Sequence, residues 1–353
     1  MKTIEMKSKW IKDVERIRGP RISRHNFLRL DKNEKINSFQ KKFFFSAIKK
    51  INSNHLTSYP EVENLYKLIA KKNKVKVDNL VITAGSDQAI KHCFELFVKK
   101  NDKIITLNPT FAMVDIYAKL FGAKQIKIDY NRELALNLKN LFSNIKKNIS
   151  LIIIANPNSP TGTILKIDEI KKILNKAKKF QIPVLIDEAY HGFSKSNCIP
   201  LINNYSNLIV TRTFSKSFGL AGCRIGYIAS STKIAKLLFK LKPMYEVNSL
   251  ALLFAEEALK NNLDTKYSYE TFQGKLALVN FLKNKNINNF NTYANFIHID
   301  FGEKRNKAIN IFNKNKILIK GGPGVKGCEN FLRITLGPRK YMMKVISLIK
   351  KII

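Results

Sequence analysis

The stretch TRTFSKSFGLAGCRIGYI, residues 211–228, places a hydroxyl beside a lysine, Ser215 and Lys216, and an arginine, Arg224, eight positions after that lysine. The segment is otherwise apolar enough to belong to a protein core. Burying an ammonium or a guanidinium group without a partner is costly. The sequence therefore predicts that an anionic or covalently bound group meets Lys216 and Arg224.

Short apolar runs alternate with helical patterns on the N-terminal side of this stretch. The runs predicted to be buried strands are 79–83, 103–107, 124–128, 151–155, 182–187 and 207–211. The helical patterns between them lie at 86–100, 111–121 and 166–180. Such alternation is typical of an α/β fold with a mostly parallel, doubly wound sheet.

The pattern changes after about residue 245. A helical stretch at 249–262 is followed by three short apolar runs and a final amphipathic helix, which indicates a smaller α+β domain over 246–353. Residues 1–40 show no regular pattern and are expected to pack as an arm. The remaining 41–245 is predicted to be the large domain.

Composition sets outer limits on the kind of protein. The 353 residues are 45% hydrophobic, which is ordinary for a globular chain, and no apolar run reaches the roughly 18 residues that a membrane span needs. The first 21 residues contain no apolar stretch, so no signal peptide is expected. The four cysteines form no CxxC pair and no Cys/His cluster, which favours reduced thiols in the cytoplasm and no metal site.

The formal net charge of +37 raises the alternative of nucleic-acid binding. The lysines, however, are spread along predicted helix faces, and no aromatic-interleaved basic stripe stands out. We therefore attribute the charge to compositional drift and expect neither a nucleic-acid nor a membrane partner.

Ligand sites in doubly wound sheets lie beyond the carboxyl ends of the strands. The residues that follow the predicted strands are, in chain order, Gly85, Ser86, Phe111, the NPNSPTG turn at 156–162, Asp187, Tyr190 and Lys216. Together they suit one ligand, a flat and phosphorylated aromatic aldehyde. Its aldehyde would join Lys216 as a Schiff base, and a ring nitrogen would pair with Asp187. Tyr190 would bind a ring oxygen, and Phe111 would stack on the ring.

The phosphate of such a ligand would lie where backbone N–H groups and an arginine converge. Gly85 and Ser86 begin a predicted helix, whose N-terminus favours anions. Ser215 and Arg224 would complete the phosphate site, the arginine as a two-pronged donor. The cofactor-binding residues are expected to include Asp87 and Thr213, which stand in the same two motifs.

The ordered motifs AGSD, NPTF, NPNSPTG, DEAY, TFSKSFGLAGCRIGY and LRITLG, at 84–87, 108–111, 156–162, 187–190, 213–227 and 332–337, resemble the pyridoxal-phosphate aminotransferases of fold type I. The resemblance extends from 30 to 337, and the nearest branch is similar to the histidinol-phosphate aminotransferases and the related threonine-phosphate decarboxylases. It implies pyridoxal 5'-phosphate as cofactor. It also implies that Lys216 is both the Schiff-base lysine and the base that moves the substrate proton.

The same resemblance implies a homodimer with shared active sites. Tyr59 matches a tyrosine that reaches the cofactor phosphate of the neighbouring subunit, and Arg333 matches the arginine that binds the substrate α-carboxylate. Asn33 matches a position in the N-terminal arm, which in this family packs on the small domain and on the partner. The expected reaction moves an amino group from an amino acid, with glutamate as the first candidate, to a small carbonyl acceptor.

Two departures from the family pattern bear on specificity. Where the family has an asparagine before Pro-Thr-Gly, this chain has Ser159, so Asn156, Asn158 or Ser159 is left to contact the ring oxygen, and we keep Asn158 as the expected residue. Where the family has an arginine for the distal phosphate of the substrate, this chain has Lys320. A lysine lacks the planar fork of arginine, so histidinol phosphate is expected to be a poor substrate.

Three classes of function remain at this point. Transamination is the leading hypothesis, and decarboxylation of a phosphorylated amino acid on the same cofactor is the alternative, because the ring stabilises a carbanion whichever Cα bond breaks. A nucleic-acid-binding protein on an inactive enzyme scaffold is the third. Lys216 and Asp187 argue against it, because a scaffold needs neither residue.

Overall fold

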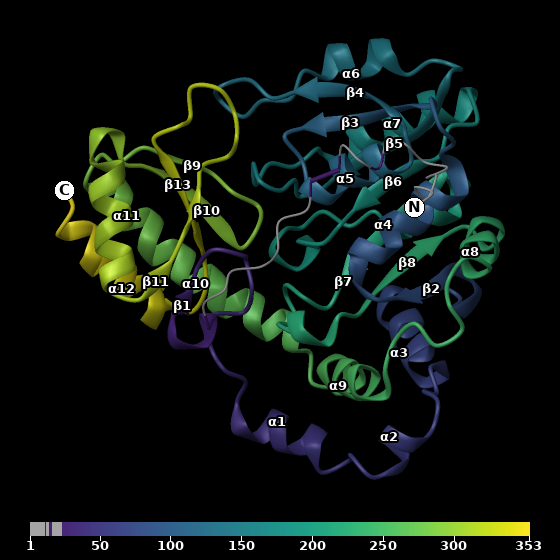
Figure 1. Ribbon diagram of the computed structural model, residues 1–353, viewed down its shortest axis with the longest axis horizontal. Helices are drawn as coiled ribbons and strands as arrows, with labels where there is room; N and C mark the ends of the chain where they lie inside the picture. Colours follow the sequence, from purple (N-terminus) through teal and green to yellow (C-terminus); the bar gives the residue numbers. More distant parts are fainter. Residues whose placement is uncertain (1–10, 12–13, 16–22) are drawn as a thin grey trace, which may run out of the picture.

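The larger sheet of the protein has seven strands in the order β2-β8-β7-β6-β5-β3-β4 (Figure 1). In the computed structural model, which describes residues 11, 14–15 and 23–353, these strands are β2 (Leu80–Thr83), β3 (Lys103–Asn108), β4 (Lys124–Asp129), β5 (Ile149–Ala155), β6 (Val184–Asp187), β7 (Leu208–Thr213) and β8 (Gly226–Ser230). Only β8 runs antiparallel to its neighbours, and the alternation pattern did not predict this strand. The mostly parallel sheet expected from the sequence is confirmed.

The central strands are apolar throughout because both faces of the sheet are covered. Along β5, Leu151 and Ile153 face one core, whereas Ile152 and Ile154 face the other. The first core lies under α4 (Gly85–Phe97), α5 (Ala112–Leu120) and α8 (Thr232–Phe239). The helices that contribute to the second core are α1 (Lys41–Ile48), α3 (Glu63–Asn73), α6 (Leu138–Asn144), α7 (Ile167–Lys179) and α9 (Ser249–Lys260).

The smaller sheet is antiparallel, with four short strands in the order β12-β13-β10-β9. These strands are β9 (Asn289–Phe290), β10 (Phe296–Asp300), β12 (Lys320–Gly321) and β13 (Phe331–Thr335). The helices associated with this part are α10 (Leu263–Asn284), α11 (Arg305–Lys314) and α12 (Arg339–Lys350). The 22-residue α10 extends from beside α9 to the smaller sheet (Figure 1). Its polar residues are spread around the helix, which is why sequence periodicity did not reveal it.

The N-terminal arm is attached to the smaller sheet region at two points. Strand β1 (Leu28–Arg29) pairs in parallel with β11 (Ile317–Leu318), and Leu30 is part of the same apolar core as α12. Most of the arm before residue 23 lies outside the described residues. Helix α9 lies just after the domain boundary predicted at residues 245 and 246. It packs in the core of the larger sheet, although the sequence pattern assigned it to the smaller domain.

A short helix lies between α1 and α3. Helix α2 (Asn54–Thr57) follows α1 and precedes the Ser58–Pro60 stretch that carries Tyr59. Within residues 11, 14–15 and 23–353, no helix is both long and apolar enough to cross a membrane.

Candidate active site

A cavity of about 140 Å³ opens at the carboxyl ends of β5, β6 and β7. It is lined by nine of the residues expected from the sequence, Ser86, Asp87, Phe111, Asp187, Tyr190, Thr213, Ser215, Lys216 and Arg224. Ser159, one of the three alternatives left open for the ring oxygen, also lines it, together with Ala155 and Ala189, which were not expected. The strand-end rule therefore located the cavity correctly, because neighbouring parallel strands deliver their following residues to one edge.

Asp187 is the last residue of β6 and is 5% exposed. Its Oδ1 accepts a hydrogen bond of 2.8 Å from Thr211 Oγ1, which stands directly opposite on β7. Burial raises the pKa of Asp187 to about 6, and the hydrogen bonds from Thr211 and from the Ala189 N–H oppose this rise. A buried carboxylate of this kind suits a positively charged N–H donor.

Lys216 follows β7 and faces Tyr190 across the cavity. Its Nζ donates to the Lys32 carbonyl at 3.0 Å and lies 5.5 Å from the centre of the Tyr190 ring. The Tyr190 hydroxyl accepts from Asn33 Nδ2 at 2.9 Å. Burial raises the pKa of Tyr190, but the charges of Lys216 and Arg333 and hydrogen bonds from Asn33 and Ser159 lower it overall. The Tyr190 oxygen is thus surrounded by donors.

Hydrogen-bond donors also gather around Ser215, which lines the cavity. Its Oγ accepts from Thr213 Oγ1 at 3.0 Å and from Arg224 Nη1 at 3.3 Å. Gly85, at the start of α4, has φ 85°, and a Cβ there would lie 2.9 Å from Arg224 Nη2. The positive φ favours glycine at this position, and the guanidinium of Arg224 lies close to the start of the helix. The hydroxyls, the guanidinium and the N–H groups that begin α4 suit a phosphate.

Asp87 and Phe111 also line the cavity. Asp87 Oδ1 accepts from Tyr117 of α5 at 2.9 Å, so α4 and α5 are joined beside the site. Phe111 is the residue before α5, where it was expected at a strand exit.

In the NPNSPTG turn, Asn158 does not point into the cavity, where it was expected to contact the ring oxygen. Asn158 Nδ2 donates to the Pro109 carbonyl at 3.0 Å and to Thr161 Oγ1 at 2.8 Å, and the residue does not line the cavity. Asn156 is also held inside the turn, since its Oδ1 accepts from the Leu165 N–H at 2.7 Å. Of the three alternatives left open by the sequence, Ser159 is the one that lines the cavity.

The smaller sheet and the arm carry the expected substrate-binding residues, none of which lines the cavity itself. Lys320, Arg333 and His298 stand directly opposite one another on β12, β13 and β10, and such neighbours in an antiparallel ladder share a face. Arg333 Nη2 donates to the Asp31 carbonyl at 2.9 Å, its Nε is buried without a partner, and burial lowers its pKa. Lys320 is exposed. The unpaired Nε leaves Arg333 able to bind an anion.

Asn33 joins the arm to both parts of the site. It is 2% exposed, and its backbone N–H donates to Thr335 Oγ1 at 3.1 Å while its side chain donates to Tyr190. Its φ of 58° lies in the left-handed region that asparagine tolerates. Sequence reasoning found Asn33 only through the family resemblance, and it missed Thr335 and Thr211. The signal for Thr211 was its position on the strand next to Asp187.

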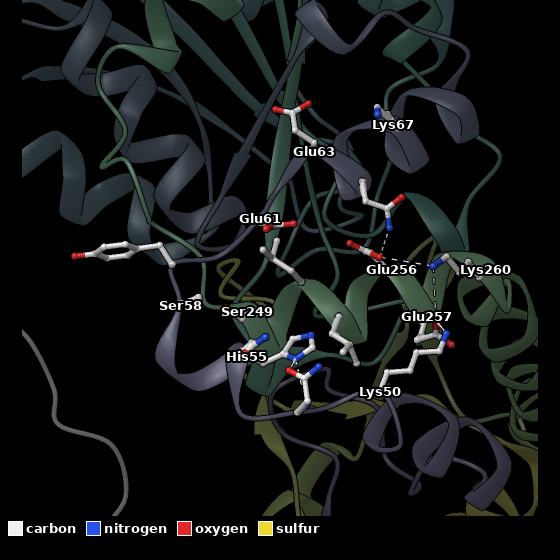
Figure 2. A pocket seen from close by; sticks show the side chains of 16 residues that line it. Lys50, His55, Ser58, Glu61, Glu63, Lys67, Ser249, Glu256, Glu257 and Lys260 are labelled. Carbon is white, nitrogen blue, oxygen red and sulfur yellow. Dashed lines mark hydrogen bonds and ion pairs between the residues drawn. The ribbon is translucent and has the colours of Figure 1, made fainter.

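Tyr59 is not part of the cavity in its own chain. It is 73% exposed, stacks on Tyr245 with ring centres 4.1 Å apart, and lines a separate groove of about 650 Å³ between α1–α3 and α9. Figure 2 shows that charged side chains of this groove pair with one another, Lys260 with both Glu256 and Glu257. Lys50 also pairs with Glu257. Such paired charges favour a structural role for the groove.

The described residues contain no group of three or more His, Cys, Asp or Glu side chains arranged to hold a metal ion.

Comparisons with known proteins agree with this geometry. The sequence profile of the family described as aminotransferase class I and II matches residues 31–349. The histidinol-phosphate aminotransferase of Caldanaerobacter subterraneus is 32% identical over 86% of this chain and 86% of its own length. That of Christiangramia forsetii is 32% identical over 88% of this chain and 89% of its own length.

Solved structures share the fold. Histidinol-phosphate aminotransferase from Clostridium acetobutylicum superposes with a TM-score of 0.81 at 24% identity, over 92% of this chain and 98% of that one. The enzyme from Sinorhizobium meliloti, in complex with pyridoxal-5'-phosphate, gives a TM-score of 0.80 at 21% identity, over 92% and 90%. The chain therefore belongs to the class I and II aminotransferases, and it is a pyridoxal-phosphate-dependent enzyme of fold type I.

Proposed function

We propose that this aminotransferase interconverts histidinol phosphate and the corresponding carbonyl compound, with glutamate as the amino donor. The observation that supports this most directly is the pairing of Arg333 with Lys320 on one face of the smaller sheet. Both half-reactions need an anion to be held there, the α-carboxylate of glutamate or the phosphate of histidinol phosphate. The names of the relatives at 32% identity point to the same substrate.

The cavity fits pyridoxal phosphate by the chemistry of its donors. Ser215, Arg224 and the start of α4 would hold the phosphate, and Asp187 would face the ring nitrogen as a carboxylate. Pyridoxal phosphate, when bound, supplies an electron sink for the carbanion formed at the substrate Cα. The raised pKa of Asp187, about 6, falls once a cationic N–H lies beside it, because an opposite charge favours the ionised carboxylate.

Lys216 has two roles in this proposal. Its Nζ would hold the cofactor covalently in the resting enzyme, and it would move the proton at the substrate Cα. Tyr190, with Ser159 beside it, would donate to the ring oxygen, and Asn33 fixes the Tyr190 hydroxyl from the arm. Ser159 takes the place that the family gives to asparagine, because Asn158 is held by the turn.

We further propose a homodimer whose two sites are shared. The exposed apolar side chains Phe45, Leu56, Tyr59 and Met244 are 52%, 73%, 73% and 78% exposed, which is a large apolar surface to leave in water. Tyr59 would reach the cofactor phosphate of the partner subunit. The enzyme would act in the cytoplasm, since all four cysteines are unpaired.

Mixed dimers test the shared site. When Tyr59→Ala and Lys216→Ala chains are refolded together, one site of each hybrid carries both defects and the other carries neither. Activity should return to a fraction of wild type in the mixture, whereas each variant alone stays inactive or impaired. Hybrids shown by differential tagging to be present, but without recovered activity, would count against sharing.

The reaction itself is tested one half at a time. Purified enzyme loaded with cofactor should convert glutamate to 2-oxoglutarate in a single turnover, with a matching change in cofactor absorbance. Histidinol phosphate should then give the same absorbance change as donor in the reverse direction. Release of carbon dioxide from a phosphorylated amino acid, with no keto acid from glutamate, would assign the decarboxylase alternative instead.

A further inference from the structure

A second cavity of about 630 Å³ lies where α10 meets the loops that follow β5 and β6. Its walls come from segments 164–167 and 192–196 on the side of the larger sheet, and from α10 and segment 292–294 on the other side. It shares no lining residue with the cofactor cavity. An occupant would therefore touch both sheet regions of the protein without entering the active site.

The charge of this second cavity is entirely positive. Lys166, Lys195 and Lys275 line it, and its lining, drawn from the described part of the chain, includes no aspartate or glutamate. Lys275 Nζ donates to the Thr292 carbonyl, an uncharged acceptor, and burial lowers the pKa of Lys275. An ammonium group in this setting is stabilised by an anion, because burial without a counter-charge is unfavourable.

The second cavity also exposes aromatic surface. Phe272 and Tyr293, which line it from α10 and from the loop before β10, are 51% and 40% exposed. Ser268, Phe272 and Lys275 are spaced so that they lie on one face of α10. The Ser268 Oγ is buried and has no hydrogen-bond partner, so a polar group remains to be satisfied beside the apolar surface.

We propose that this cavity is a binding site for a small organic anion with an aromatic body, held by the three lysines and packed against Phe272 and Tyr293. The volume lies in the range of about 300–1,000 Å³ that is usual for small-molecule sites, which are mostly apolar with a few placed polar groups. Ala294, another lining residue, packs against Tyr190, so the occupant sits one layer from the cofactor site. This proposal does not depend on which substrate binds in the active site.

Calorimetric titration of the cofactor-loaded enzyme with phenyl phosphate tests the site. Phenyl phosphate should bind with a Kd below about 1 mM, whereas phenol and inorganic phosphate, each with half of the required chemistry, should bind at least about ten-fold more weakly. Lys275→Met and Phe272→Ala should each weaken the binding by about ten-fold, the loss expected for one charge-assisted hydrogen bond or one aromatic contact.

Matched variants on the same helix separate this site from others. Lys283→Met and Tyr269→Ala remove an exposed lysine and an aromatic side chain that is 65% exposed, and neither residue lines the cavity, so both should bind phenyl phosphate like wild type. Lys166→Met provides a surface substitution should Lys275→Met disturb folding, and thermal melting reports on that. Absence of binding, or equal binding by all variants because the probe occupies the active site, would overturn the proposal.

Discussion

The two sides of the active site are built in different ways. One side, which we call the floor, consists of Asp187, Ser215, Lys216 and Arg224 from the larger sheet, and its internal hydrogen bonds join residues no more than 24 positions apart. The other side, the wall of Asn33, Lys320 and Arg333, depends on contacts between the arm and the smaller sheet across 302 positions.

This difference separates two tasks. The floor is positioned mainly by strand pairing, although Lys216 also donates to the Lys32 carbonyl of the arm. We therefore expect the cofactor chemistry to depend less than substrate binding on how the arm and the smaller sheet dock. The wall is held by a few hydrogen bonds and carries the cations that we propose to bind the substrate. Substitutions in the wall are therefore expected to change substrate affinity, whereas substitutions in the floor are expected to change the chemical step or the binding of the cofactor.

The largest effect should come from the floor, at Lys216. Lys216→Ala should lower kcat by at least about 10⁴-fold, the upper end of what a positioned acid–base group contributes, because the covalent attachment is lost as well. Steady-state kinetics measure this, with the exposed Lys233→Ala as a control. Borohydride reduction of the wild type followed by peptide mapping should place the cofactor on Lys216. Label on another lysine would contradict the assignment.

A smaller loss is expected when the charge of the floor is removed at Asp187. Asp187→Asn should lower kcat by about 10²–10³-fold, similar to the loss of one preorganised electrostatic group in other enzymes. The ring nitrogen then has no carboxylate to stabilise its positive charge. Asp168→Asn, whose side chain is 87% exposed, is the control. Unchanged kinetics in Asp187→Asn would show that another group faces the ring nitrogen.

In the wall, Arg333→Lys should raise the KM for glutamate while the cofactor spectrum stays that of the wild type. Losing one charge-assisted hydrogen bond costs about 1.5–3 kcal/mol, which corresponds to about one to two decades of affinity. Arg339→Lys, on the exposed start of α12, makes the same change away from the site. A changed cofactor spectrum in Arg333→Lys would show that the wall also affects the cofactor, which contradicts the division of tasks between wall and floor.

Also in the wall, Lys320→Arg should strengthen the binding of a substrate phosphate. The planar fork of arginine adds a second hydrogen bond, so the KM for histidinol phosphate should fall by up to about ten-fold. Lys326→Arg is the exposed control. The Lys320 departure in the sequence predicts a poor substrate, whereas the proposed function requires a good one. A wild-type kcat/KM of about 10⁴ M⁻¹s⁻¹ or more with histidinol phosphate would support the proposed function and show that Lys320 already suffices.

The smallest effect is a shift in pH dependence set by Thr211. Cofactor affinity should decrease as the pH falls through about 6, because protonation of Asp187 removes the charge that pairs with the ring. Thr211→Val deletes the hydrogen bond that lowers the pKa of Asp187, so the midpoint should move upward by about one pH unit. Fluorescence titration with cofactor across pH 5–8 measures it. A midpoint that stays in place would assign the transition to another group.

The floor was predictable from the sequence because its residues follow apolar runs directly and converge by strand order alone. Asp187, Tyr190 and Lys216 follow predicted strands and line the cavity, as expected, whereas Arg224 was identified from its position eight residues after Lys216. Ser159 was only one of three alternatives, because the choice depends on which side chains the turn itself consumes. The side-chain amide of Asn158 donates to Pro109 and Thr161 inside the turn. Short-range sequence patterns do not show which side chains a turn uses for its own hydrogen bonds.

The wall and some elements of the fold needed three-dimensional information. Strand β8 is short and antiparallel, and α10 has no continuous apolar face, so periodicity alone could not assign either. The hydrogen bond between Asn33 and Tyr190 joins segments 157 positions apart, and it depends on how the arm docks. The family resemblance indicated Asn33 as a site residue, but no local pattern indicated its partners.

The 302-position contact between Asn33 and Thr335 also orders events during synthesis of the chain. Domains begin to fold as they emerge from the ribosome, N-terminal parts first. Every strand of the larger sheet is complete at Ser230, so the floor can assemble while β13 has yet to be made. The hydrogen bond from Asn33 to Thr335 can form only after almost the entire polypeptide has been synthesised. A chain interrupted before β13 would therefore carry a cofactor pocket that cannot select its substrate.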